Sequence, residues 1–125
     1  TRRSTPPAKP RTMLRPGESA ERRAERYLRA QGLRLLDRNY RSPHGEIDLI
    51  MQDGATLVFV EVRLRSNPRF GSGADSIDHR KRQRLLRTAE HYLQRQRRIP
   101  ACRFDVVSLD GTGKIHWIPD AFGAE

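Results

Sequence analysis

The chain has 125 residues, enough for one domain with a single core and too few for two ordinary domains. Its formal net charge is +10, with 22 Arg against 3 Lys, which favours a polyanionic partner such as nucleic acid; a merely solvated basic surface is the alternative. No apolar run approaches the roughly 18 residues of a membrane span, and the single Cys102 argues against a disulfide scaffold or cysteine-based zinc site, so we expect a cytoplasmic protein without membrane contact.

The N-terminal part of the chain divides into a tail and a helix. Residues 1–16 hold four Pro and five basic residues with almost nothing apolar, which predicts a disordered basic tail before one domain over residues 17–125. A first helix is predicted over about residues 17–31, where apolar side chains recur at steps of three and four: Ala20, Ala24, Tyr27 and Leu28. Gly32 ends this pattern, and a short strand is predicted over 33–40.

The central segment predicts a β-hairpin. Two strand-like apolar runs within residues 44–65 flank Asp53-Gly54, which is typical of a two-residue hairpin turn. With Asp53 and Gly54 as the two central turn residues, Gln52 pairs with Ala55.

The rest of the chain predicts one helix and two strands. After a loop rich in Gly, Ser and Asn at 65–78, Asp78 can cap a second helix over about 79–98. The strands "CRFDVVSLD" and "KIHWIP" follow, with Cys102 and Trp117 expected in the core. The order helix, three strands, helix, two strands predicts an α/β sandwich around a mixed sheet.

The predicted hairpin gathers acidic side chains on one face of its two strands. With the turn given above, Glu46 lies opposite Glu61, and Asp48 lies opposite Phe59. The other face is apolar throughout: Ile47, Leu49, Met51, Val58, Val60 and Val62. Like charges on paired strands destabilise them, so a purely structural hairpin would not favour this arrangement.

Three groups of the hairpin form a candidate metal site. The carboxylates of Asp48 and Glu61 and the backbone carbonyl of Val62 are hard oxygen ligands suited to Mg²⁺ or Mn²⁺. The alternative is a solvated hairpin face on which Arg63 and Arg65 neutralise the acids.

A glutamate of the first helix is a further candidate. On a helical wheel Glu21 flanks the apolar stripe and points toward the sheet, whereas Glu18 and Glu25 lean further into solvent. An ordinary surface glutamate is the alternative for Glu21.

Several segments resemble a known family in the right order: "GESAERRAERYL", "RNYRSPHGEIDLI", "LVFVEVRLRSNPRFG", "RKRQRLLRTAEHYL", "CRFDVVSL" and "IPDAF". The resemblance is to the bacterial YraN family of uncharacterised proteins and covers about residues 17–122. That family is similar to the restriction-endonuclease-like PD-(D/E)XK nucleases, especially archaeal Holliday-junction resolvases. The resemblance implies a restriction endonuclease-like three-layer sandwich, with a mixed sheet flanked by helices.

The resemblance also implies roles for individual residues. Asp48 and Glu61 match the acids of the first and second strand, and Glu21 matches the helix glutamate of a "GxxxExxA" pattern. Glu46 lies in the "GEID" segment and is a further candidate acid. Arg63 stands where the superfamily has lysine, which leaves binding intact and puts catalysis in doubt, because arginine does not shed its proton. Lys81 matches a basic position of the family and is expected to approach the same site.

We therefore expect a metal-dependent, structure-selective endonuclease that hydrolyses phosphodiesters in DNA, such as branched or junction DNA. The ion would be held by Asp48, Glu61, Val62 and Glu21. Residues expected to contact the nucleic acid, besides the loop at 67–73, are Arg63, Arg65, Arg69, Arg80, Lys81, Arg82, Arg84 and Arg87. The alternatives are a non-catalytic nucleic-acid-binding protein with a vestigial nuclease site and a basic protein packed in a ribonucleoprotein. Two-fold enzymes are common in the superfamily, so a homodimer is a further expectation.

Overall fold

The computed structural model of the chain describes residues 18–65 and 77–123. The predicted tail at 1–16 and nearly all of the predicted loop at 65–78 lie outside these residues, as does Arg69. Within the described ranges, no helix is long and apolar enough to cross a membrane.

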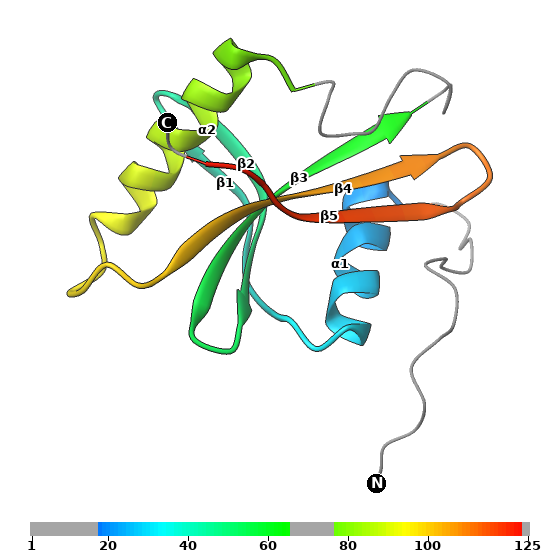
Figure 1. Cartoon of the computed structure of the whole chain (residues 1–125), viewed down its shortest axis with the longest axis horizontal. Helices are drawn as coiled ribbons and strands as arrows, with labels where there is room; N and C mark the ends of the chain where they lie inside the picture. Colours follow the sequence, from blue (N-terminus) through cyan, green and yellow to red (C-terminus); the bar gives the residue numbers. More distant parts are fainter. Residues whose placement is uncertain (1–17, 66–76, 124–125) are drawn as a thin grey trace, which may run out of the picture.

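The elements follow in the predicted order and form one mixed sheet (Figure 1). The elements are α1 (Ala20–Ala30), β1 (Arg34–Ser42), β2 (Gly45–Asp53), β3 (Thr56–Arg65), α2 (His79–Leu93), β4 (Cys102–Asp110) and β5 (Ile115–Phe122). Neighbouring strands lie in the order β1-β2-β3-β4-β5. Of these neighbours, β3 and β4 are parallel, because the chain crosses between them through α2, and the other pairs are antiparallel. The predicted α/β class and element order are confirmed.

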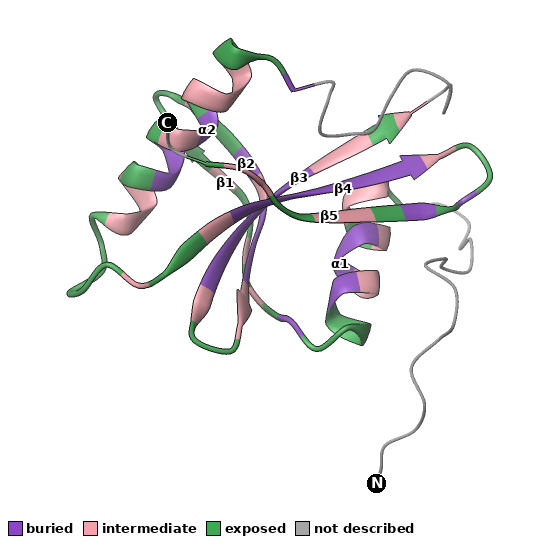
Figure 2. Cartoon of the chain, in the orientation of Figure 1, coloured by how far each residue is buried: buried purple, intermediate pink, exposed green. Residues whose placement is uncertain are grey.

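The two helices cover opposite faces of the sheet and divide the core in two. On the α1 face, Ala24 and Leu28 pack against strand residues that include Leu49 and Val60. On the α2 face, Leu85 and Ala89 pack against a second set that includes Phe59. The central strands β2, β3 and β4 are buried between these layers (Figure 2). A polar group on a central strand is therefore largely removed from water unless a gap in a helix layer exposes it.

Each helix begins at a side-chain cap. The Ser19 hydroxyl accepts the Arg22 N–H at 3.1 Å, and the Asp78 carboxylate accepts the Lys81 N–H at 2.8 Å, as predicted for Asp78. The second helix ends at Leu93, earlier than the predicted end near residue 98. Residues 94–98 contain no apolar side chain and are all exposed, so packing gives no reason to extend the helix.

Candidate active site

The β2–β3 turn lies one residue later than the sequence predicts. Asp53 pairs with Thr56, so the central turn residues are Gly54 and Ala55. Gly54 has a φ of +60°, and glycine in the first central position suits a type II′ turn. The predicted strand register was therefore wrong by two positions. When the observed register is continued along the strands, Asp48 lies opposite Glu61.

The apolar face of β2 also differs from the prediction at Ile47. This side chain packs in the α2-side cluster with Ile50, whereas Leu49 belongs to the α1-side cluster. The alternation breaks where Asn39, with a φ of 52°, lies on β1 opposite Asp48. The local irregularity leaves Asp48 next to clefts on both sides of the strand.

Asp48 lies where the β2–β3 ladder opens. The last paired residues are Leu49 and Val60, and beyond them the Val62 N–H donates to Oδ2 of Asp48 at 2.9 Å instead of to the β2 backbone. The N–H and C=O groups of a strand residue point to the same side, so the Val62 carbonyl also faces β2. The Asp48 carboxyl and the Val62 carbonyl, both predicted metal ligands, thus border the same opening between β2 and β3.

The pKa of the Asp48 carboxyl is strongly raised. Burial raises its pKa from 3.8 to about 7, with a further increase from the negative charge of Glu61 and smaller ones from Glu21 and Glu46. The hydrogen bond from Val62 opposes this rise. Among the described residues, Asp48 forms no ion pair.

Glu61 is nearly buried and has cationic neighbours. Its side chain is 7% exposed, and its Oε2 lies 2.7 Å from Nζ of Lys81 and 3.9 Å from Nη1 of Arg63. Lys81 belongs to the first turn of α2, which Asp78 caps. The basic side chain closest to the second acid therefore comes from α2, and Arg63 is more distant.

Two clefts meet at Asp48. The smaller, of about 150 Å³, opens on the α2 side and is lined by Gly45, Glu46, Asp48, Glu61, Lys81, Arg84 and Leu85. The larger, of about 300 Å³, opens on the α1 side and is lined by Ser19, Glu21, Arg22, Glu25, Arg38, Asn39, Arg41, Asp48 and Leu49. Glu21 and Glu61 therefore approach Asp48 from opposite sides, and in the described part of the chain no three His, Cys, Asp or Glu side chains are grouped to hold a metal ion.

The donor set nevertheless fits a divalent cation bound mainly by two carboxylates. Asp48 and Glu61 repel each other, and Asp48 has no cationic partner within the described ranges, so a bound cation would relieve the repulsion. Oxygen ligands from both acids and Val62 suit Mg²⁺ or Mn²⁺, which usually keeps several water ligands. Glu21 lies in the α1-side cleft and is not part of a preformed group of acids within the described ranges.

Glu46 has a more exposed position than the other acids. Its side chain is 39% exposed and its Oε2 lies 3.8 Å from Nε of Arg41, although Glu46 still lines the α2-side cleft. A weak exposed pair of this kind leaves the carboxylate available to solvent.

The basic residues of α2 separate into two groups. Arg80, Arg84 and Arg87 are exposed and follow steps of four and three residues, so they form one ridge, called here the α2 ridge. Arg82 does not belong to it, because its Nε donates to the Ile77 carbonyl at 3.1 Å and its guanidinium lies over the Phe122 ring. Arg65 lies at the end of β3, beyond Arg63.

Two carboxylates outside the acid pair are buried, which the sequence analysis did not predict. Glu25, expected in solvent, is 4% exposed and accepts two hydrogen bonds from Arg38, which hold its pKa below the usual value. Asp105 is fully buried and accepts from Arg103 and from the Trp117 indole. A charged residue at an inward position of a strand or helix was the available signal in both cases.

Cys102 is exposed, contrary to the prediction of a core residue. Its thiol donates to the Pro100 carbonyl at the start of β4, before the strand enters the core. Trp117 packs against the α1-side core, as expected.

Comparison with known proteins gives consistent matches over most of the chain. The model described as "Uncharacterised protein family UPF0102" matches residues 20–109. A UPF0102 protein of Methylobacillus flagellatus is 57% identical over 111 residues, covering 86% of this chain and 96% of that protein. One of Ralstonia pickettii is 53% identical over 114 residues (87% and 90%), and one of Nitrosococcus oceani is 50% identical over 122 (94% and 98%).

Proposed function

The chain belongs to the uncharacterised protein family UPF0102, and we propose that it is a metal-dependent, structure-selective endonuclease that hydrolyses phosphodiesters in DNA. The family expected from the sequence is thereby confirmed, whereas the resemblance to nucleases stays a prediction. One observation carries the proposal: Asp48 is held beside Glu61 at the opening between β2 and β3, without a cationic partner in the described residues.

The acid pair would hold the ion together with the Val62 carbonyl, and Glu21 would contribute through water. Mg²⁺ or Mn²⁺ bound there would polarise the scissile phosphate and lower the pKa of a bound water. The Val62 N–H fixes one oxygen of Asp48, which leaves the other oxygen for a ligand. Glu61 is buried and Asp48 is half-buried, so their charges are less screened by solvent than those of exposed acids.

Two cationic side chains border this acid pair and would act on the phosphate. Lys81 has an ammonium that can hydrogen-bond to an oxygen of the substrate or to the attacking water. Arg63 would neutralise a phosphate oxygen. Lys81, which approaches Glu61 from α2, would therefore take the role of the lysine that is absent at position 63.

The α2 ridge supplies a path for the nucleic acid away from the acids. Arg84 lines the α2-side cleft, and Arg80 and Arg87 flank it on the same exposed side of the helix. From residue 80 to residue 87 the helix rises about 10 Å, a length over which three guanidinium groups can contact successive phosphates. Contacts of this kind recognise the backbone and its shape, which fits a structure-selective enzyme.

A non-catalytic nucleic-acid-binding protein is the second candidate. It is favoured by the 2.7 Å contact between Lys81 and Glu61, because an internal ammonium already neutralises one acid. The lack of a three-acid group in the described ranges points the same way. This candidate predicts binding through the α2 ridge with no metal-dependent cleavage.

The deciding experiment incubates the purified protein with branched and linear DNA in Mn²⁺, Mg²⁺ or EDTA. Asp48→Asn and Glu61→Gln are compared with Glu90→Gln, which removes an exposed acid of α2 outside both clefts. Cleavage that needs the ion and is lost only in the first two variants supports the nuclease. Binding without cleavage by the unaltered protein supports the second candidate.

A further inference from the structure

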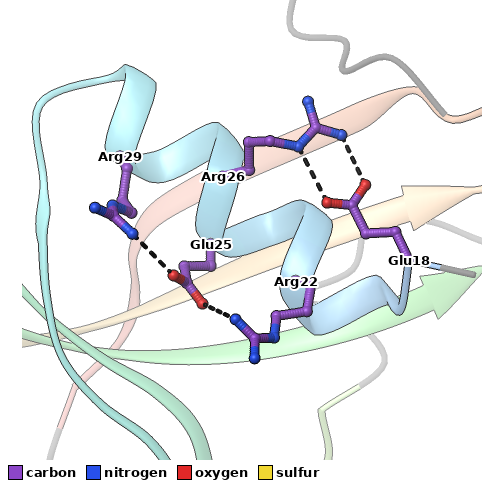
Figure 3. A pocket seen from close by; sticks show the side chains of 5 residues that line it. All are labelled: Glu18, Arg22, Glu25, Arg26 and Arg29. Atoms are coloured by element: carbon purple, nitrogen blue, oxygen red, sulfur yellow. Dashed lines mark hydrogen bonds and ion pairs between the residues drawn. The ribbon is translucent and has the colours of Figure 1, made fainter. Parts of the chain in front are cut away.

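A cluster of arginines covers the outer side of α1 (Figure 3). This helix lies on the opposite face of the sheet from the α2 ridge. Five of its members line a cleft of about 400 Å³, and Arg38 of β1 joins them by a hydrogen bond to Glu25. The cluster, called here the α1 arginine cluster, consists of Glu18, Arg22, Glu25, Arg26, Arg29 and Arg38. Four arginines against two glutamates leave it positively charged.

The buried carboxylate of Glu25 organises this cluster. Arg38 meets it with two hydrogen bonds of 2.7 and 2.9 Å, which already neutralise the acid. Arg29 adds a contact of 3.3 Å and Arg22 one of 3.8 Å, although their side chains are 59% and 57% exposed. Exposed pairs of this kind add little stability. The two guanidinium groups therefore keep most of their donors directed to solvent, where they can bind an anion.

Neighbouring clefts share lining residues from one face of the sheet to the other. Arg22 and Glu25 line both the cleft of the α1 arginine cluster and the α1-side cleft at Asp48. Asp48 in turn lines both that cleft and the α2-side cleft that contains Lys81. The shared residues thus lie between the basic surfaces on the two faces of the sheet, with the acid pair in the middle.

The spacing of the two basic surfaces excludes a straight duplex as the common ligand. One sheet and two helix layers of about 10 Å each separate the outer sides of α1 and α2 by roughly 30 Å. Duplex DNA is stiff over such a length and does not fold around the domain without a sequence-dependent cost. A branch point gives two arms that diverge without this bending.

We propose that the α1 arginine cluster binds the phosphate backbone of a second DNA arm while the α2 ridge binds the first. The branch point then lies at Asp48, where the two clefts meet. This inference rests on the proposed function for its substrate class, and it names the residues that distinguish branched from linear DNA. Arg22 and Arg29 are the specificity-determining contacts of the α1 face.

The test measures equilibrium binding of the full chain to a branched DNA and to a linear duplex, in EDTA and at several salt concentrations. The double variant Arg22→Gln/Arg29→Gln is compared with Arg97→Gln/Arg98→Gln, which removes two exposed charges between α2 and β4. Glu25 keeps Arg38 in the first variant, so the helix remains packed. We expect a loss of about 10- to 100-fold in affinity for branched DNA and a salt slope smaller by about two, with duplex binding unchanged.

Three results would overturn the inference: branched-DNA affinity equal to that of the unaltered protein, an equal loss on branched and linear DNA, or no branched-DNA binding by the unaltered protein. A loss of the same size in the Arg97→Gln/Arg98→Gln control would also overturn it, because net charge would then be the cause. Cleavage in Mn²⁺ is scored separately. If the protein binds both arms but cuts no DNA, this inference stands and the nuclease proposal fails. If it cleaves DNA without any dependence on the α1 arginine cluster, the nuclease proposal stands and this inference fails.

Discussion

Nζ of Lys81 lies 2.7 Å from Oε2 of Glu61, whereas Nη1 of Arg63 lies 3.9 Å from the same oxygen. Arg63 occupies the sequence position at which the nucleases that this sequence resembles carry lysine, yet the closer cation comes from the first turn of α2. The capping of α2 by Asp78, through the Lys81 N–H, fixes the backbone from which this ammonium extends. The cation nearest to Glu61 is thus Lys81, which the fold brings in from α2, and not the residue two positions after Glu61 in the sequence.

Lys81 is therefore expected to matter more for cleavage than Arg63. We predict that Lys81→Gln lowers the rate of DNA cleavage at saturating DNA by about 10²- to 10³-fold, the range typical of a lost proton-transfer or charge-stabilising group. Arg63→Gln should weaken DNA binding with a much smaller effect on that rate. Single-turnover rates and affinities measured on the same substrate separate the two effects. Equal rate losses in the two variants would contradict the prediction.

The raised pKa of Asp48 predicts a pH-dependent cost to stability. The folded carboxyl, with a pKa of about 7, holds its proton more tightly than the unfolded one at 3.8, so the free energy of unfolding falls as pH rises through this window. Asp48→Asn removes the titration and can still accept the Val62 N–H. In EDTA the variant should exceed the unaltered protein in stability at pH 8, by up to about 4 kcal/mol.

This difference should shrink as pH falls and vanish near pH 4. Denaturant unfolding of both proteins at pH 4, 6 and 8 measures it, and other titrating groups cancel in the comparison. A difference that does not change with pH would show that Asp48 is ionised throughout.

Divalent cations should offset the loss of stability that ionised Asp48 causes at high pH. An ion held by Asp48 and Glu61 binds the folded state, so Mn²⁺ at 100 times its Kd should add about 2.7 kcal/mol to the free energy of unfolding at pH 8. The effect should be smaller at pH 5, where Asp48 is protonated, and absent in Asp48→Asn. Thermal unfolding with increasing Mn²⁺ measures it, with Glu90→Gln as the control. An equal Mn²⁺ effect in Asp48→Asn would exclude this site.

The acid pair could be found from the sequence because alternation along two strands fixes which side chains share a face. Shifting the turn from Asp53-Gly54 to Gly54-Ala55 changed the register by two positions, which leaves every β3 side chain on its predicted face and brings Asp48 closer to Glu61. The positive φ of Asn39 and the displacement of Ile47 have no such signal, because they depend on how β1 packs. The contact between Lys81 and Glu61 joins segments that are far apart in the sequence, and only the resemblance to a known family indicated that Lys81 approaches the site.

Asp105 stabilises the fold as a buried hydrogen-bond acceptor, whereas Asp48 and Glu61 are assigned to the proposed site. Its carboxylate is fully buried and accepts hydrogen bonds from Arg103, the Trp117 indole and the Asp120 N–H. Asp105→Asn would leave Arg103 partly unpaired in the interior, and we predict a loss of about 3–5 kcal/mol in the free energy of unfolding. Denaturant unfolding followed by the fluorescence of Trp117 measures both the loss and the local change.

Asp53 provides the matched control. It pairs with the same Arg103 at 3.0 Å, but its side chain is 45% exposed, so Asp53→Asn should cost less than about 1 kcal/mol. Similar losses in both variants would mean that the ion pair with Arg103, rather than burial at Asp105, determines the stability.

Gly45 positions the start of β2 against α2, close to the acid pair. Its φ is +151°, and a Cβ at this residue would lie 3.3 Å from Oγ1 of Thr88. Gly45→Ala therefore forces β2 away from α2 and strains the backbone, at a cost of about 1–3 kcal/mol. Since Gly45 lines the same cleft as Asp48 and Lys81, the displacement should also lower metal-dependent cleavage by at least tenfold. Gly111→Ala, where an added Cβ meets nothing within 4 Å, should leave both quantities unchanged, and an equal effect in that variant would contradict the positioning role.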